Sequence, residues 1–178
     1  KDLVSDGLIN QSDAADIATA RRSRDEALLH PLEIIAAKQL VQESDLKPLS
    51  VDLLTQWLAE KAQLQLAHID PLKINVPAVT SIMSFAYAKR YGILCLKVTR
   101  DELLVATMQP FDRSWIASLE QTSRRTIRTV VANPAEIKKY TLEFYSLAKS
   151  VFGAGSSATT GAGIANFEQL LEVGKLKD

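Results

Sequence analysis

The sequence has one cysteine, no long apolar run and no excess of either charge. Cys95 cannot form an intramolecular disulfide, and a lone thiol in an apolar pattern is typical of a small buried side chain in a reducing compartment. Lys+Arg and Asp+Glu are both 21, so the basic surplus that nonspecific nucleic-acid binding needs is missing. No apolar run approaches the roughly 18–20 residues of a membrane span. We expect a protein of a reducing compartment that does not insert into the membrane or bind nucleic acid.

Catalytic and metal-binding motifs are missing too. The glycine-rich stretch 153–163 lacks the glycine spacing of a phosphate-binding loop, and alanine stands where its lysine would be. No GxSxG motif supports a serine nucleophile. His30 and His68 lie far apart with no cysteine or carboxylate cluster, which favours structural roles over zinc binding or general-base catalysis. We predict that this chain has no catalytic or metal site and is not itself an enzyme.

Residues 1–65 are predicted to form a small helical bundle without strands. Apolar residues at helical spacing predict three short helices, over residues 9–22, 30–40 and 49–64. Ser12 and Ser50 are the expected N-caps of the first and third, and Pro31 stands in the first turn of the second.

Residues 66–152 are predicted to form a compact α+β sandwich in the order β-α-β-β-α-β-α. The expected strands are 66–70, 93–98, 103–108 and 126–132. The expected helices run from Pro77 to a stop at Gly92, over 113–122, and from a cap at Asn133 to about 151. Trp57 and Trp115 are assigned to the core. Alternation in the hairpin predicts a buried face made of Leu94, Leu96 and Val98, so Leu96→Asp is expected to unfold this part.

The C-terminal stretch divides into a linker and a short helix. Four of the seven glycines lie in residues 153–163, which predicts a flexible linker. Residues 164–178 are expected to begin a connector helix, with an apolar face of Ile164, Phe167, Leu170 and Leu171. That face requires a partner.

Two groups of arginines are candidates for contact with a phosphate or an acidic partner. The first consists of Arg21, Arg22 and Arg24, and the second of Arg124, Arg125 and Arg128. Acidic residues next to the first group offset part of its positive charge. The second lies at the entry to a predicted strand, where alternation sends Arg124, Thr126 and Arg128 to one side. A solvated face is the alternative interpretation of both.

Several stretches together resemble the N-terminal region of the secretion and pilus-assembly ATPases, the "E" protein of type II secretion and its type IV pilus relatives. "LVSDGLI" with "AADIATA", and "LSVDLLTQWLAEKAQL", are similar to the two halves of that family's helical repeat. "IDPLKINVPAVTSIMSFAYAKRYGILCLKV", "VATMQPFD" and "VVANPAEIKKYTLEFYSLAKSV" are similar to its αβ domain. "FEQLLEVGKL" resembles the connector before the ATPase core.

The resemblance implies a parent protein that is a hexameric cytoplasmic ATPase, assembling a pilus or pseudopilus at the inner membrane. It also implies that this region docks the motor onto the cytoplasmic part of an inner-membrane platform protein, while the catalytic loop lies downstream. ATP and Mg²⁺ would belong to the parent's core, and this chain would carry no cofactor. We expect a non-catalytic docking module excised from a longer polypeptide.

The alternative function implied by the resemblance is cyclic di-GMP binding, which some relatives perform with the helical repeats. The chain departs from their pattern: residues 30–32 read His-Pro-Leu instead of Arg-Leu-Gly, and Gln39 replaces a glycine. Arg21 and Lys61 stand where terminal glutamines would, and "QESDLKP" is inserted in the second repeat. Arg21, Arg24 and Lys61 remain candidate phosphate contacts, and docking is the favoured function.

Overall fold

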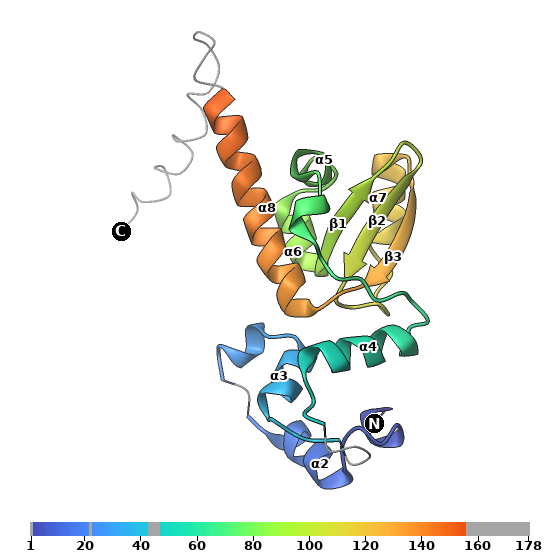
Figure 1. Ribbon diagram of the computed structural model, residues 1–178, viewed down its shortest axis with the longest axis vertical. Helices are drawn as coiled ribbons and strands as arrows, with labels where there is room; N and C mark the ends of the chain where they lie inside the picture. Colours follow the sequence, from blue (N-terminus) through green and yellow to red (C-terminus); the bar gives the residue numbers. More distant parts are fainter. Residues whose placement is uncertain (1, 22, 43–46, 156–178) are drawn as a thin grey trace, which may run out of the picture.

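The computed structural model describes residues 2–21, 23–42 and 47–155 (Figure 1). Its helices are α1 (Asp2–Ser5), α2 (Gln11–Thr19), α3 (Pro31–Ala37), α4 (Val51–Lys61), α5 (Val76–Thr80), α6 (Phe85–Tyr91), α7 (Ile116–Ser123) and α8 (Pro134–Gly155), with 3₁₀ turns η1 (Glu26–Leu28) and η2 (Pro71–Lys73). Its strands are β1 (Ile93–Val98), β2 (Glu102–Thr107) and β3 (Thr126–Val131). Mixed helices and one small sheet confirm the α+β class.

The helical part contains the three predicted helices as α2, α3 and α4, and adds α1 and η1. Ser50 caps α4 as predicted, since its hydroxyl accepts a hydrogen bond from Leu53 N at 3.2 Å. The cap predicted at Ser12 is wrong: Asn10 caps α2 through its side-chain oxygen, at 2.7 Å from Asp13 N. Six buried apolar side chains form the core of this part: Leu8, Ile9, Leu32, Ile35, Leu49 and Leu54.

Helix α3 begins with a reciprocal pair of side-chain caps. His30 Nδ1 accepts a hydrogen bond from Leu32 N at 3.3 Å, and Glu33 Oε2 accepts one from His30 N at 2.7 Å. This pair is a capping box, and Pro31 occupies the first helical position as predicted. Burial lowers the pKa of His30, which favours the neutral imidazole that this cap requires.

Helices α3 and α4 each end near a glutamine in the left-handed conformation. Gln39 and Gln63 both have φ of 53°, a region that favours glycine. Beyond α4, Gln63 N donates to Glu60 O at 3.1 Å and Leu64 N donates to Ala59 O at 3.0 Å. These two bonds form a Schellman motif, so the fold imposes the strained conformation on Gln63.

Gln63→Gly is expected to stabilise the protein by about 0.5–1 kcal/mol, because glycine relieves the left-handed strain of a side chain. Gln56→Gly is the matched control on the exposed face of α4, where glycine should instead destabilise by about 1 kcal/mol. Urea denaturation measures the change in the free energy of unfolding for both variants, and the two changes should have opposite signs. A loss of stability in Gln63→Gly would contradict the assigned helix end.

The sheet has three strands in the order β1-β2-β3. β1 and β2 pair antiparallel, and β2 and β3 pair parallel. The strand predicted at residues 66–70 is absent: Leu66 forms an isolated bridge to Val131, and Ala67 N donates to Val131 O at 2.7 Å. Asp70 and Pro71 end this extended stretch, because they start η2 and Asp70 Oδ1 accepts from Leu72 N at 3.1 Å. Residues 66–70 thus contact β3 at Val131 and do not form the predicted additional strand.

The predicted buried face of the hairpin is wrong at Leu96. The register shifts between Cys95 and Lys97, so Leu96 is an extra residue in β1. Ile93, Leu94 and Cys95 are all at most 2% exposed, whereas Leu96 is only partly buried. This bulge breaks the alternation on which the Leu96→Asp expectation depended. Burial raises the pKa of the Cys95 thiol to about 11, in agreement with a structural role.

The helix predicted from Pro77 to Gly92 is two helices. Ser84 interrupts it and caps α6, since its hydroxyl accepts from Tyr87 N at 3.2 Å. Gly92 ends α6 in the left-handed conformation, as predicted, with φ of 59°. A Cβ at this position would lie 2.8 Å from Met108 Cγ, so close packing also requires glycine.

The last helix begins as predicted and runs further. Asn133 Oδ1 accepts a hydrogen bond from Ala135 N at 2.9 Å, and Pro134 is the first helical residue. Helix α8 continues to Gly155, into the predicted linker. The rest of the linker and the predicted connector helix, residues 156–178, lie outside the described residues.

The αβ part is built around β2, and α8 runs alongside its sheet (Figure 1). Leu103 and Val105 of β2 are completely buried. The helical part lies against one end of the αβ part, where α4 contacts β3 and α3 contacts α8. Each part has its own hydrophobic cluster, while the boundary between residues 65 and 66 stays a prediction.

Polar side chains join the two parts. Lys138 of α8 forms an ion pair with Glu33 of α3, and its ammonium also donates to Leu28 O at 3.1 Å. The Glu33 side chain is only 13% exposed. Asn133 Nδ2 donates to Asp52 Oδ1 at 2.7 Å. The junction therefore depends on specific hydrogen bonds as well as on apolar contact.

Lys138→Met is expected to destabilise the protein by about 1–2 kcal/mol, because the largely buried Glu33 carboxylate would lose its cation. Adding Glu33→Gln should recover part of that loss, which a double-mutant cycle by urea denaturation measures. Lys73→Met is the control, since its ion pair with Asp70 is exposed and should contribute under about 1 kcal/mol. Equal losses in the two single variants would contradict a special role for the junction pair.

Candidate functional site

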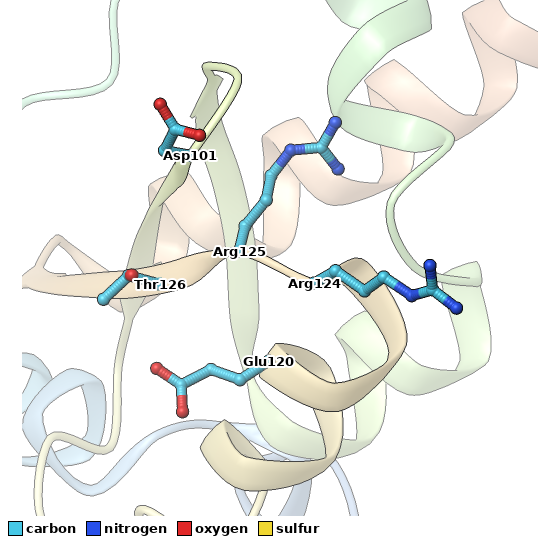
Figure 2. A pocket seen from close by; sticks show the side chains of 5 residues that line it. All are labelled: Asp101, Glu120, Arg124, Arg125 and Thr126. Carbon is cyan, nitrogen blue, oxygen red and sulfur yellow. The ribbon is translucent and has the colours of Figure 1, made fainter.

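A shallow cleft of about 490 Å³ lies where α7 ends and β3 begins, beside the turn between β1 and β2. It is lined by Asp101, Glu120, Arg124, Arg125 and Thr126. Figure 2 shows the two arginine side chains extending to one side and the two carboxylates lying on the other. Two of the three arginines of the second predicted cluster therefore share one surface.

Arg125 is fixed by the backbone around it. Its Nε donates to Thr99 O at 2.9 Å, and its Nη1 donates to Ser123 O at 3.3 Å. Both acceptors are neutral carbonyls, and within the described residues Arg125 forms no ion pair. The positive charge is thus held in place without being neutralised.

Arg124 is positioned by the end of α7. It has φ of 55°, and its backbone N donates to Glu120 O at 2.8 Å. This left-handed residue precedes β3, so strand alternation does not position its side chain, but Arg124 lines the cleft together with Thr126, and both residues are exposed like Arg128. The Arg124 side chain is exposed and forms no ion pair in the part of the chain that the structure describes.

Arg128 does not line this cleft. It is exposed on β3, and its Nη2 donates to Gln65 Oε1 at 2.6 Å, in the segment that follows α4. The structure thus assigns Arg128 to the contact between the two parts of the protein.

The two carboxylates of the cleft were not predicted from the sequence. Asp101 O accepts from Thr126 N at 2.9 Å, and Glu120 Oε1 accepts from Ile127 N at 3.2 Å. Both residues therefore tie the start of β3 to neighbouring elements. The parallel pairing of β2 with β3 brings Asp101 here, and no local sequence signal predicts that pairing.

The candidate nucleotide contacts are not gathered at one cavity. Lys61 forms an ion pair with Asp6 at 2.7 Å, and Trp57 Nε1 donates to the same carboxylate at 2.7 Å. These two partners lower the pKa of Asp6. A cavity of about 620 Å³ beside them is lined by neither Arg21 nor Arg24, which are exposed between α2 and η1. Lys61 already has a carboxylate partner.

The structure places the tryptophans and histidines that the sequence singles out as follows. Trp115 is 1% exposed, as predicted. Trp57 is only partly buried: its ring packs against the core of the helical part, and its Nε1 donates to Asp6 Oδ2. His68 is exposed and lies outside the strands, and His30 caps α3.

Within the described ranges, no group of three or more His, Cys, Asp or Glu is arranged to hold a metal ion. No helix among the described residues is long and apolar enough to cross a bilayer.

Comparison with known families identifies this architecture. The family model for the MshEN domain matches residues 62–151, which include the sheet, most of α8 and the arginine cleft. The chain belongs to the MshEN-domain family. The match begins just after Lys61, so the candidate nucleotide contacts lie outside the matched residues.

One relative and two solved structures are similar to this MshEN-domain protein. The type IV pilus assembly ATPase TfpB of Acinetobacter baylyi is 34% identical over 174 residues, which are 97% of this chain and 30% of the relative. The chain thus spans less than a third of that protein. These findings confirm the resemblance to secretion and pilus-assembly ATPases.

The solved structures show the fold. A structure of MshE with cdg (cyclic di-GMP) matches with a TM-score of 0.55 and 17% identity, covering 80% of this chain and 95% of that one. The N-terminal domain of XpsE matches with a TM-score of 0.51 and 16% identity, covering 79% and 88%. This chain thus shares its fold with both solved structures.

Proposed function

We propose that this chain is the non-catalytic docking module of a pilus-assembly or secretion ATPase. It links a hexameric, ATP- and Mg²⁺-dependent motor to the cytoplasmic part of an inner-membrane platform protein. The observation that carries the proposal is the 34% identity to a type IV pilus assembly ATPase across 97% of this chain. The module acts in the cytoplasm, at the membrane only through its partner.

The arginine cleft is the docking surface in this proposal. Arg124 is exposed and Arg125 is held by backbone carbonyls, and neither charge is paired among the described residues. Guanidinium groups fixed in this way favour a carboxylate-bearing partner over an apolar one. An acidic segment of the platform protein therefore has the complementary chemistry.

Arg124→Glu is expected to weaken binding of the platform protein's cytoplasmic domain at least about tenfold, because the reversed charge repels an acidic segment. Arg124→Gln should have a smaller effect, since it removes the charge without reversing it. Lys38→Glu makes the same reversal on an exposed residue at the end of α3 and should leave binding unchanged. Calorimetry measures all three. Undiminished affinity in Arg124→Glu would exclude this cleft, and no binding by the unaltered chain at tens of micromolar would overturn docking.

Cyclic di-GMP binding is the second candidate function, favoured by the shared fold with MshE, which was solved with cdg. Its contacts in this chain would be Arg21, Arg24 and Lys61. The ion pair with Asp6 opposes this role of Lys61, because a phosphate would have to displace that carboxylate. Submicromolar binding by calorimetry that disappears in Arg21→Ala would establish this function in place of docking. Lys38→Ala is the control for loss of one exposed charge.

A further inference from the structure

An apolar groove of about 530 Å³ lies between the helical part and helices α6 and α8. Four large apolar side chains that line it are unusually exposed: Leu28 at 79%, Leu29 at 39%, Phe85 at 37% and Leu142 at 59%. They come from three elements distant in sequence, so the fold creates this surface. Contiguous exposed apolar surface of this kind marks a binding site more often than scattered side chains do.

The groove has a positive rim and an unpaired buried hydroxyl. Among the described residues, Lys89, Arg90 and Lys138 line it together with His30, and no carboxylate does. Lys138 is paired with Glu33, whereas Lys89 and Arg90 form no ion pair among the described residues. Thr141 also lines the groove, is 5% exposed, and its Oγ1 has no hydrogen-bond partner in the described part of the chain. The groove therefore suits an apolar ligand that carries acidic groups and an acceptor.

One segment of this chain has that chemistry. Residues 164–173 place Ile164, Phe167, Leu170 and Leu171 on one face at helical spacing. Glu168 and Glu172 stand four residues apart at the edge of that face, and no lysine or arginine lies between Lys149 and Lys175. An acidic amphipathic segment thus follows α8 in the same polypeptide.

The segment is able to reach the groove. From Leu142, at the groove, to Gly155 the helix α8 covers about 20 Å. Residues 156–163 span at most about 26–29 Å when extended, and their glycines and serines allow the chain to reverse. A helix running back antiparallel to α8 therefore meets Leu142 and Phe85.

We propose that residues 164–173 dock into this groove as an amphipathic helix. Their apolar face covers Leu28, Phe85 and Leu142, and Glu168 and Glu172 pair with Arg90 and Lys89. The proposed occupant is a segment of the same chain. This inference does not depend on the docking function of the arginine cleft.

Disulfide trapping in the full chain tests the proposal. Lys89→Cys with Glu172→Cys replaces one predicted charge pair by two thiols, while Arg90 and Glu168 remain. Cys95 does not interfere, because it is buried and its thiol has its pKa raised to about 11. An intramolecular disulfide is expected to form at least about tenfold faster than in the control Thr126→Cys with Glu172→Cys, since docking raises the effective concentration of the thiols.

The outcomes separate the possible occupants. Adding Phe167→Asp to the trapped pair should slow the disulfide to the control rate, because the apolar face is broken. A disulfide-linked dimer in place of the monomer would overturn the proposal in favour of a second copy. Equal rates of disulfide formation in the test and control pairs would also overturn the proposal, and would indicate that a separate partner occupies the groove.

Discussion

Val105→Asp is expected to unfold the αβ part of the protein. Val105 lies in the central strand β2, pairs with both Cys95 and Thr129, and is completely buried. Because its strand partners Cys95 and Thr129 carry no positive charge, burying an unpaired carboxylate there costs at least about 4–5 kcal/mol, which approaches the total stability of many domains. Circular dichroism and thermal denaturation should show loss of the cooperative transition.

Two controls on the preceding strand make this prediction specific. Lys97→Asp places the same carboxylate at an exposed position of β1 and should change stability by less than about 1 kcal/mol. Leu96→Asp lies at the bulge, where the side chain is partly buried, and its loss should fall between the other two. A Val105→Asp protein that melts like the unaltered chain would show that β2 is not the centre of the core.

Trp115→Ala is expected to lower the free energy of unfolding by about 3–5 kcal/mol. The indole is 1% exposed, and its Nε1 donates to Asp112 O at 3.0 Å. The backbone oxygen of Trp115 accepts a hydrogen bond from Tyr87 OH at 3.1 Å, which ties α6 to the start of α7. Removing the ring leaves a cavity at this contact between elements.

Trp115→Phe separates the volume effect from the hydrogen bond. It retains most of the apolar ring and loses the donor, so it should cost about 1–2 kcal/mol. Urea denaturation followed by far-ultraviolet circular dichroism compares the two variants without depending on the lost fluorophore. A cost for Trp115→Ala no larger than that for Trp115→Phe would indicate that the site collapses around the smaller side chain.

The arginine cleft and the apolar groove give this MshEN domain two surfaces with different chemistry. The cleft presents two guanidinium groups that form no ion pair among the described residues, together with two carboxylates, whereas the groove presents apolar side chains with a cationic rim. Occupation of the groove by residues 164–173 would couple the segment after α8 to the junction that Lys138 and Glu33 hold together. Partner binding and segment release are therefore measurable separately with the two sets of variants.

The sequence by itself determined the starts or ends of several helices, and the family. Ser50, Pro31 and Asn133 predict the starts of α4, α3 and α8, and Gly92 predicts the end of α6, because caps act through hydrogen bonds and dihedral angles within a few residues. The resemblance to pilus and secretion ATPases was also available from the residues alone.

Only the tertiary structure decided the features that depend on distant contacts. The bulge at Leu96 arises from the pairing of β1 with β2, and the parallel β2–β3 pairing brings Asp101 beside Arg125. The groove needs Leu28, Phe85 and Leu142, which belong to three separate elements. Local periodicity carries no information on which elements meet, because that choice follows from packing the whole set of apolar faces at once.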